Sequence, residues 1–295
     1  MIGSLPLSAP ELESRIIPAL QTIEDRLMEV VTSADETINP PTSHLAEAGG
    51  KRLRPVLALL TAQLGDPALA TGEEIRDAGV AVELTHIATL YHDDVMDEAP
   101  LRRGAPSAQT VWGNSAAILT GDVLVARASQ LVAALGPEAV MAHAKTFERL
   151  CMGQLHETLP RPAGTDPVDH YIQVLADKTG SLIAVSARYG AMLTGAGART
   201  EQIVEEFGER IGVAFQLADD VIDLISDSAT TGKTPGTDLR EGVDTMPVLL
   251  LRKALAAGEL DAAGQAILSR LSTGDLSDDA FLSDVVARLR EHPVL

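Results

Sequence analysis

The chain contains very little cysteine and few aromatic residues. Among its 295 residues there is one cysteine, Cys151, and phenylalanine, tryptophan and tyrosine together make up 3%. One cysteine excludes an intrachain disulfide and any zinc site made of several thiolates, and it is typical of a protein from a reducing compartment. Since alanine, leucine and valine supply most of the apolar residues, the composition favours helices over a β-sandwich. We therefore expect an all-α fold.

Positive charge is also scarce. Lysine and arginine number 23 against 42 acidic residues, which gives a formal net charge of −19. Nucleic-acid-binding proteins need a basic surface, so nucleic acid is excluded as a partner, and any polyanion must be bound locally. The sequence has no basic N-terminal region followed by an apolar run, and no uncharged apolar stretch of about 18 residues. We expect a cytoplasmic protein with no integral membrane segment, and a single domain over residues 1–295.

Apolar residues at helical spacing predict several long helices and no sheet. Pro18 predicts a kink or a second start in the first helix, and the proline-rich stretch 39–43 predicts a loop. Thr71 and Glu74 are suited to cap the helix that follows. The predicted long helices cover residues 9–33, 71–97, 114–135, 137–159 and 201–225, and shorter ones run to the end.

The first group of candidate site residues lies in the segment Leu90–Gly104, LYHDDVMDEAPLRRG. Asp93 and Asp97 are four residues apart, so both carboxylates project from one face of a helix. Like charges at this spacing repel each other, and a divalent cation would reverse that penalty. Arg102 and Arg103 follow, and paired guanidinium groups suit phosphate oxygens. Carboxylates and arginines together suggest a metal-bound diphosphate.

A second aspartate cluster repeats this spacing, with Asp219 and Asp223 four residues apart and Asp220 beside the first. One such cluster is equally compatible with a solvated helix face. Two clusters in apolar helices favour a metal site shared between helices, because unpaired carboxylates would be costly there. Oxygen ligands without thiolates point to Mg²⁺, with Mn²⁺ as the alternative.

Further cations would complete a diphosphate site. They lie in the segment Gly49–Arg54, in Arg102 and Arg103, and at Lys178 and Lys233. A basic segment alone is more often a solvated helix start. His86 lies on the helix face of Asp93, and its spacing fits a diphosphate donor and a buried polar residue equally well.

The chain resembles the trans-isoprenyl (polyprenyl) diphosphate synthases of the medium- and long-chain type. The resemblance runs from about residue 45 to residue 247 and rests on motifs in order: GGKRLRP, ELTHIATLYHDDVMDEAPLRRG, GNSAAILTGD, DKTGSL, FQLADDVIDL and GKTPGTDLREGVDTMP. It implies a large helical bundle with a central active-site cavity. The implied reaction is the Mg²⁺-dependent condensation of isopentenyl diphosphate with an allylic diphosphate to a longer all-trans polyprenyl diphosphate.

The resemblance also implies roles for individual residues. Asp93, Asp97 and Asp219 would bind Mg²⁺, with Asp94, Asp220 and Asp223 in support. Arg102, Lys178, Thr179, Gln216 and Lys233 would hold the allylic diphosphate, and Lys51, Arg54, His86 and Arg103 would hold isopentenyl diphosphate. Many family members have a lysine at the position of Val243, so one diphosphate contact is expected to be missing here.

Product length in this family depends on side chains four and five positions before the first aspartate, where bulky aromatic residues stop growth early. Here those positions are Thr89 and Ala88, and Thr85 lies further down the helix. The first motif also lacks the two-residue insertion of many bacterial farnesyl diphosphate synthases. Both features imply a product beyond farnesyl length.

Two other functions are weighed against this one. A class I terpene cyclase also ionises a prenyl diphosphate, but its second metal motif usually contains Asn, Ser and Glu, whereas here the second cluster is Asp219–Asp223. A noncatalytic subunit of a heteromeric prenyl synthase tends to lose its aspartate clusters, and both are intact. The resemblance further implies a homodimer, for which the apolar helix 114–135 is a candidate interface.

Overall fold

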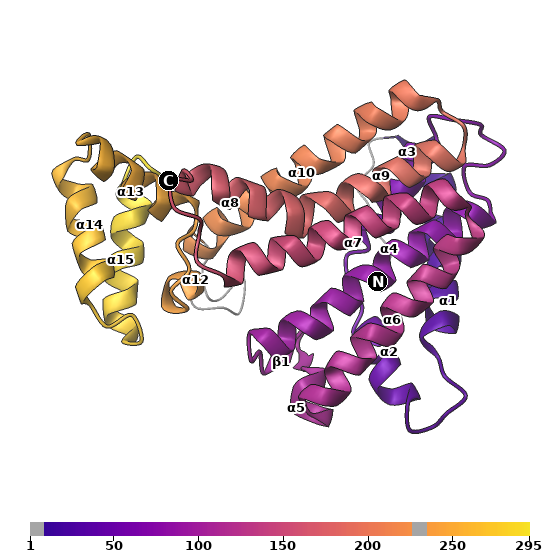
Figure 1. Ribbon diagram of the computed structural model, residues 1–295, viewed down its shortest axis with the longest axis horizontal. Helices are drawn as coiled ribbons and strands as arrows, with labels where there is room; N and C mark the ends of the chain where they lie inside the picture. The colour runs from indigo at the N-terminus through magenta and orange to yellow at the C-terminus, as the bar shows by residue number, and fades with distance from the viewer. Residues whose placement is uncertain (1–8, 226–234) are drawn as a thin grey trace. The chain divides into compact units, whose positions relative to one another are not determined.

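The protein is almost entirely helical in a computed structural model that describes residues 9–225 and 235–295 (Figure 1). The chain divides into two compact units. Unit 1 comprises Met1–Leu150 and Gly180–Glu209, and unit 2 comprises Cys151–Thr179 and Arg210–Leu295. The predicted all-α fold is confirmed, because the described residues contain only two very short strands.

Unit 1 is organised around α4, which packs against α1, α3, α5, α6 and α9. Most of the buried apolar side chains of unit 1 form one large core, to which α4 contributes along almost its whole length. A smaller cluster lies around Ala187, Ala191 and Val204. The elements of unit 1 are α1 (Pro10–Val31), α2 (Asn39–Glu47), α3 (Leu53–Ala62), α4 (Glu73–Met96), β1 (Leu101–Arg102), β2 (Ala105–Pro106), α5 (Ala108–Trp112), α6 (Asn114–Ala134), the first part of α7 (Pro137–Thr158), α9 (Ser181–Leu193) and the first part of α10 (Ala198–Ile225).

Small residues let the helices of unit 1 approach closely. At Gly79 of α4, a Cβ atom would lie 2.7 Å from the Cδ1 atom of Ile23 on α1. At Gly190 of α9, a Cβ atom would lie 2.2 Å from the carbonyl oxygen of Ala58 on α3. Both distances are shorter than real Cβ contacts allow. The crossing at Gly190 requires glycine because the neighbour is backbone, whereas at Gly79 the end of the Ile23 side chain could shift. The close packing brings α4 against α1 and α9 against α3.

Unit 2 has its own apolar core, formed by residues such as Leu224, Val248, Ile267 and Leu282. Helix α8 begins with the side chain of Asp166, which accepts hydrogen bonds from the backbone N–H groups of Val168 and Asp169. Helices α14 and α15 pack side by side (Figure 1). The elements of unit 2 are the remaining parts of α7 and α10, α8 (Pro167–Leu175), most of a π-helical turn (Ala176–Gly180), α12 (Thr237–Arg240), α13 (Met246–Ala257), α14 (Ala262–Thr273) and α15 (Asp279–Glu291).

Two local predictions were wrong, those for residues 39–43 and for Thr71, and one of the two alternatives predicted for Pro18 is excluded. Residues 39–43 begin helix α2 instead of forming a loop, because its prolines occupy the first turn, where backbone N–H groups have no helical partner. Pro18 lies inside α1 without restarting it, since the helix buries an apolar face on both sides of the proline. Helix α4 begins after Gly72 with no side-chain cap, so Thr71 does not cap it.

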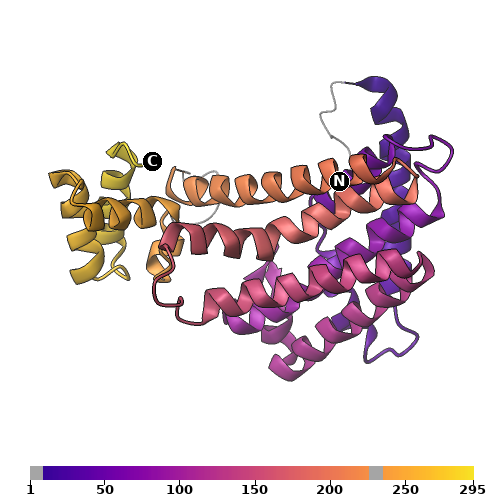
Figure 2. The ribbon, with the colours of Figure 1, turned by 45° about the horizontal axis from the view of Figure 1, so that its top comes forward.

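Helix α6 is the one described helix that is long and apolar enough to cross a membrane on length and composition. It also buries one face against α4, as a core helix of a globular protein does. Figure 2 shows α6 beside the following helix, α7. Its remaining apolar side chains, including Ile118, Leu119 and Val123, are exposed in the isolated chain.

Candidate active site

The first aspartate cluster occupies the C-terminal end of α4. The backbone N–H of Asp97 donates to the carbonyl oxygen of Asp93 over 2.8 Å, so the two residues are one helical turn apart, as predicted. Asp93 is half-buried and Asp97 is exposed. Asp94 projects from a different face of the helix and is fully buried. The two adjacent aspartates therefore have different environments.

Asp94 forms a buried ion pair with Arg102, whose Nε atom lies 2.6 Å from Oδ1 of the carboxylate. The other oxygen, Oδ2, is buried and has no hydrogen-bond partner among the described residues. Burial raises the pKa of Asp94, although Arg102 acts in the opposite direction. Asp94 is a carboxylate with one oxygen available for a further positive group.

Arg102 and Arg103 lie in a short hairpin, β1 and β2, which was not predicted because two-residue strands have no recognisable period. Arg103 and Gly104 both have positive φ angles, +54° and +81°, as in the tight turns that join twisted strands. The turn sends the two arginines in different directions. Arg103 donates hydrogen bonds from Nη1 to the carbonyl oxygens of Leu45 and Gly49.

A group of basic side chains surrounds Glu83 on α4. Arg52 lies 2.9 Å and Arg103 3.9 Å from its carboxylate, and Arg54 is close enough to interact with it electrostatically. Burial is the main cause that holds the pKa of His86 well below its ordinary value, and the positive charges of the neighbouring arginines, first Arg54, act in the same direction. His86 is therefore neutral and can donate one hydrogen bond. The structure thus brings Arg54, His86 and Arg103 together, and Lys51 is exposed at the same loop.

The second aspartate cluster lies in the unit 2 part of α10. Asp220 is buried and accepts hydrogen bonds from the Tyr171 hydroxyl over 2.8 Å and from the backbone N–H of Met246 over 3.3 Å. Burial raises the pKa of Asp220. Asp223 accepts weaker bonds from the N–H groups of Thr237 and Asp238 at the start of α12. Asp219 is exposed.

The π-helical turn between α8 and α9 presents Lys178 and Thr179. Such turns are rare and occur frequently at functional sites. Lys178 donates to the carboxylate of Glu157, and Thr179 donates over 3.4 Å to the side chain of Gln216. The predicted allylic residues Thr179 and Gln216 are therefore neighbours. Lys233 lies outside the described residues.

Neither cluster forms a compact metal site by itself: within residues 9–225 and 235–295, no three His, Cys, Asp or Glu side chains converge tightly enough to hold an ion. Carboxylates of like charge repel one another, and a bound cation would offset that repulsion. The donors present are carboxylate oxygens, which fit Mg²⁺, and Cys151 is exposed and outside both clusters.

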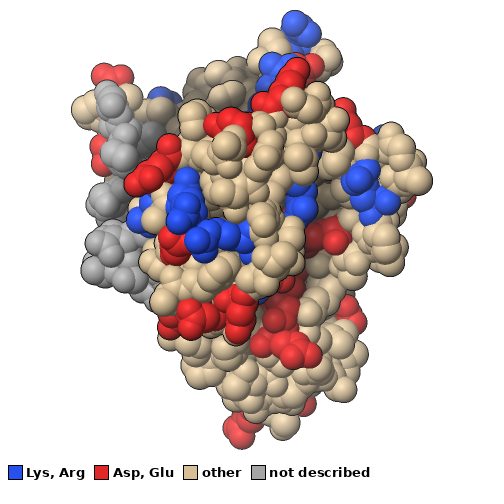
Figure 3. Space-filling model, turned by 90° about the vertical axis from the view of Figure 1, so that its left-hand side faces the viewer, with Lys and Arg blue, Asp and Glu red and all other residues tan. Residues whose placement is uncertain are grey.

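On the face drawn in Figure 3, lysine and arginine side chains lie next to aspartate and glutamate side chains. That this chain of net charge −19 binds a polyanion locally stays a prediction.

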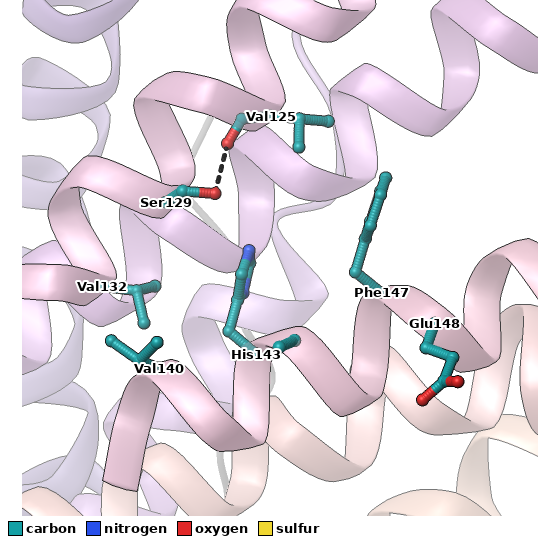
Figure 4. A pocket seen from close by; sticks show the side chains of 8 residues that line it. Val125, Ser129, Val132, Val140, His143, Phe147 and Glu148 are labelled. Atoms are coloured by element: carbon teal, nitrogen blue, oxygen red, sulfur yellow. Dashed lines mark hydrogen bonds between the residues drawn. The ribbon is translucent and has the colours of Figure 1, made fainter. Parts of the chain in front are cut away.

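A separate pocket of about 350 Å³ lies between α6 and α7, and none of the predicted site residues lines it. His143 points from α7 toward α6 near Ser129, whose hydroxyl donates to the carbonyl oxygen of Val125 (Figure 4). Both ring nitrogens of His143 are buried and have no hydrogen-bond partner among the described residues. Burial lowers the pKa of His143.

Sequence reasoning missed several residues around the site. Glu83 could have been noticed, because it is a lone carboxylate in an apolar helical stretch three residues before His86. Arg52 belongs to a motif that was recognised, but nothing in the sequence separates its role from that of Arg54. No local sequence pattern identifies Tyr171 or Glu157 as site residues, because their hydrogen-bond partners, Asp220 and Lys178, are 49 and 21 residues away.

The sequence profile of the polyprenyl synthetase family matches residues 35–271. Nonaprenyl diphosphate synthase from Mycobacterium tuberculosis is 46% identical over 99% of this chain and 85% of its own length. Component 2 of heptaprenyl diphosphate synthase from Geobacillus stearothermophilus is 36% identical, covering 90% of this chain and 85% of its own length.

A solved structure is similar over the whole chain. It is geranylgeranyl pyrophosphate synthase from Corynebacterium glutamicum, complexed with calcium and isoprenyl diphosphate, with 41% identity and a TM-score of 0.85; the match covers 98% of this chain and 86% of that one. The fold and the sequence define a prenyl diphosphate synthase, and the chain belongs to the polyprenyl synthetase family. The family predicted from the motifs is confirmed.

Proposed function

We propose that this protein condenses isopentenyl diphosphate with an allylic diphosphate, in the presence of Mg²⁺, to make an all-trans polyprenyl diphosphate beyond farnesyl length. The proposal rests on one observation above all: the family match extends over residues 35–271 and includes both aspartate clusters. We propose that residues 1–295 act as one polyprenyl synthase domain.

The proposed metal ligands are Asp93, Asp97 and Asp219, with Asp94, Asp220 and Asp223 in support. Their hard oxygen donors fit Mg²⁺, with Mn²⁺ as the alternative, and the unpartnered oxygen of buried Asp94 supports a positive group near the first cluster. When bound, the metal would supply charge stabilisation for a leaving pyrophosphate.

Basic and polar residues would hold the two substrates in different places. Hydrogen bonds and positive charges that the protein directs at the allylic diphosphate stabilise the oxygen that leaves when the carbon–oxygen bond breaks. The proposed allylic residues are Arg102, Lys178, Thr179, Gln216 and Lys233, and the proposed isopentenyl residues are Lys51, Arg54, His86 and Arg103. The structure supports the second group through the proximity of Arg54, His86 and Arg103.

The reaction then needs no nucleophilic side chain. The carbon–oxygen bond of the allylic diphosphate breaks first, giving pyrophosphate and an allylic carbocation. The double bond of isopentenyl diphosphate then attacks this carbocation and forms the new carbon–carbon bond. A proton is lost from isopentenyl C2 to a pyrophosphate oxygen, and this restores a double bond in the product. Neutral His86 can keep a hydrogen bond to the isopentenyl diphosphate throughout, because its lowered pKa prevents it from competing for that proton.

A product beyond farnesyl length is supported by the face of α4 below Asp93. Ala88 and Thr85 are buried, and Thr89 is half-buried. The hydroxyls of Thr85 and Thr89 donate to the carbonyl oxygens of Ala81 and His86, so their methyl groups are left for apolar contacts. No aromatic side chain at these positions limits growth.

We propose a cytoplasmic homodimer. The exposed apolar side chains of α6, including Ile118, Leu119 and Val123, would be covered by a second copy of the chain. Analytical ultracentrifugation of the purified chain tests this directly: a dimer mass is expected, and a monomer at micromolar concentration would refute it.

Pyrophosphate release tests the reaction class. The purified chain is incubated with Mg²⁺ and geranylgeranyl diphosphate, with and without isopentenyl diphosphate. Release that requires both substrates is expected. Release from the allylic diphosphate alone would favour the terpene cyclase, and no release under either condition would favour the noncatalytic subunit of a heteromeric synthase. Asp219→Asn should abolish release while leaving the helical circular dichroism unchanged.

A further inference from the structure

A buried carboxylate lies among the arginines of the proposed isopentenyl diphosphate site. The side chain of Glu83 is 2% exposed, and its Oε1 atom lies 2.9 Å from Nη1 of Arg52 and 3.9 Å from Nη2 of Arg103. Arg54 also interacts electrostatically with Glu83, which attracts it, and with Arg103, which repels it. Three guanidinium groups packed this closely repel one another, and Glu83 offsets that repulsion.

Arg52 uses its donors inside the protein. Its Nε and Nη2 atoms lie 2.6 Å and 2.7 Å from the two carboxylate oxygens of Glu24 on α1, and Nη1 donates to Glu83. Nη2 also donates to the carbonyl oxygen of Ala46 over 3.1 Å. By contrast, the Nε atom of Arg54 is buried without a hydrogen-bond partner in the described part of the chain. Arg52 thus uses all three of its guanidinium nitrogens within the protein, whereas Arg54 keeps at least its Nε donor for another partner.

Backbone strain occurs at the same place. Arg52 and Arg103 have φ angles of +50° and +54°, and they are two of the three non-glycine residues with positive φ in residues 9–225 and 235–295. Residues other than glycine adopt this left-handed conformation rarely, because the Cβ atom crowds the backbone. Arg52 lies in the loop before α3 and Arg103 in the hairpin after α4, and both side chains meet Glu83. A Cβ atom at Gly50 would lie only 3.0 Å from Nη1 of Arg52 and 3.1 Å from Cζ of Arg103.

We propose that Glu83 and Arg52 are positioning residues for isopentenyl diphosphate: they join the Gly49–Arg54 loop to the Arg102–Ala105 hairpin and hold Arg54 and Arg103 ready for its diphosphate. Neither residue contacts the substrate. Glu83 sets the spacing of the guanidinium groups, and Arg52 ties the loop to α1 through Glu24. The inference deepens the proposed function and rests on it.

Binding of isopentenyl diphosphate without metal tests the proposal separately from turnover. Isothermal titration calorimetry in EDTA measures the affinity of isopentenyl diphosphate for the basic residues alone, since the aspartate clusters need a metal to hold a diphosphate. Glu83→Gln keeps the shape of the side chain and removes its charge. It should weaken binding about tenfold, as expected for a disturbed charge-assisted contact. In steady-state assays, KM for isopentenyl diphosphate should rise by a similar factor, while kcat and KM for the allylic substrate stay within about threefold.

Two further variants keep the test decisive. Glu24→Gln lies on the partly exposed side of Arg52 and should weaken isopentenyl diphosphate binding about threefold, even if Glu83→Gln does not fold. Glu138→Gln removes a carboxylate from an exposed ion pair with Arg188 and should behave as wild type.

Unchanged isopentenyl diphosphate affinity in both Glu83→Gln and Glu24→Gln would overturn the proposal, as would an equal rise in KM for both substrates. These results concern the positioning residues alone. If the wild-type chain binds isopentenyl diphosphate in EDTA but releases no pyrophosphate with Mg²⁺ and both substrates, the proposed function fails instead.

Discussion

Replacement of Arg102 by alanine should strongly destabilise the protein, because Arg102 is the partner of a fully buried carboxylate. Asp94 is inaccessible, and Arg102 Nε lies 2.6 Å from its Oδ1 atom. The second oxygen already has no hydrogen-bond partner among the described residues, so Arg102→Ala leaves the whole carboxylate unpaired. Breaking a buried ion pair in this way costs about 3–5 kcal/mol.

The expected loss of unfolding free energy is somewhat smaller here, since 30% of the Arg102 side chain is exposed and water can reach the space that it leaves. We expect a loss of stability of about 2–4 kcal/mol, which lowers Tm by roughly 3–6 °C in a chain of this size. Differential scanning calorimetry measures the change. The matched control is Arg252→Ala, which breaks an exposed ion pair with Asp244 of similar length and should cost less than about 1 kcal/mol.

A double variant tests the cause. Asp94→Asn introduces a neutral amide, so Arg102→Ala combined with Asp94→Asn should recover at least half of the lost stability. A Tm shift for Arg102→Ala no larger than that of Arg252→Ala would refute the reasoning. So would a double variant that is less stable than Arg102→Ala alone.

Three other expectations concern different parts of the chain. Thr89→Phe places a ring below Asp93 and should shorten the product by at least one isoprene unit, measured by mass spectrometry; an unchanged product would place the limit elsewhere. His143→Leu removes two buried nitrogens without partners and should raise stability by about 1–3 kcal/mol. Because the folded pKa of His143 is lowered, wild-type stability falls as pH drops below about 6.5, and the variant should show a shallower fall in thermal melts between pH 7 and 5; parallel curves would contradict this. Gly50→Ala crowds Arg52 and Arg103 and should raise KM for isopentenyl diphosphate several-fold, with KM for the allylic substrate unchanged as the internal check.

The features that could be predicted from the sequence are those that depend on local spacing. Helix α4 and the Asp93–Asp97 pair follow from a 3.6-residue period, and α6 begins at Asn114 as predicted. The end of a helix in a glycine-containing segment was also predictable near Lys178, although its π-helical form was not.

Other features depend on contacts between distant segments. Local spacing does not predict which of the adjacent residues Asp93 and Asp94 is buried. Asp94 is fully buried, where it pairs with Arg102 of the hairpin. Arg52 and Glu83 are 31 residues apart, so no local pattern could reveal their pairing. The two-residue strands are likewise too short for any periodic signal.

The length of the product tests the central claim most directly. The purified chain is incubated with Mg²⁺, isopentenyl diphosphate and either farnesyl or geranylgeranyl diphosphate, and the products are analysed by mass spectrometry. A ladder of prenyl diphosphates extending beyond geranylgeranyl diphosphate is predicted. Failure to elongate either primer, with intact substrates or with hydrocarbons and alcohols as the only products, would contradict the account.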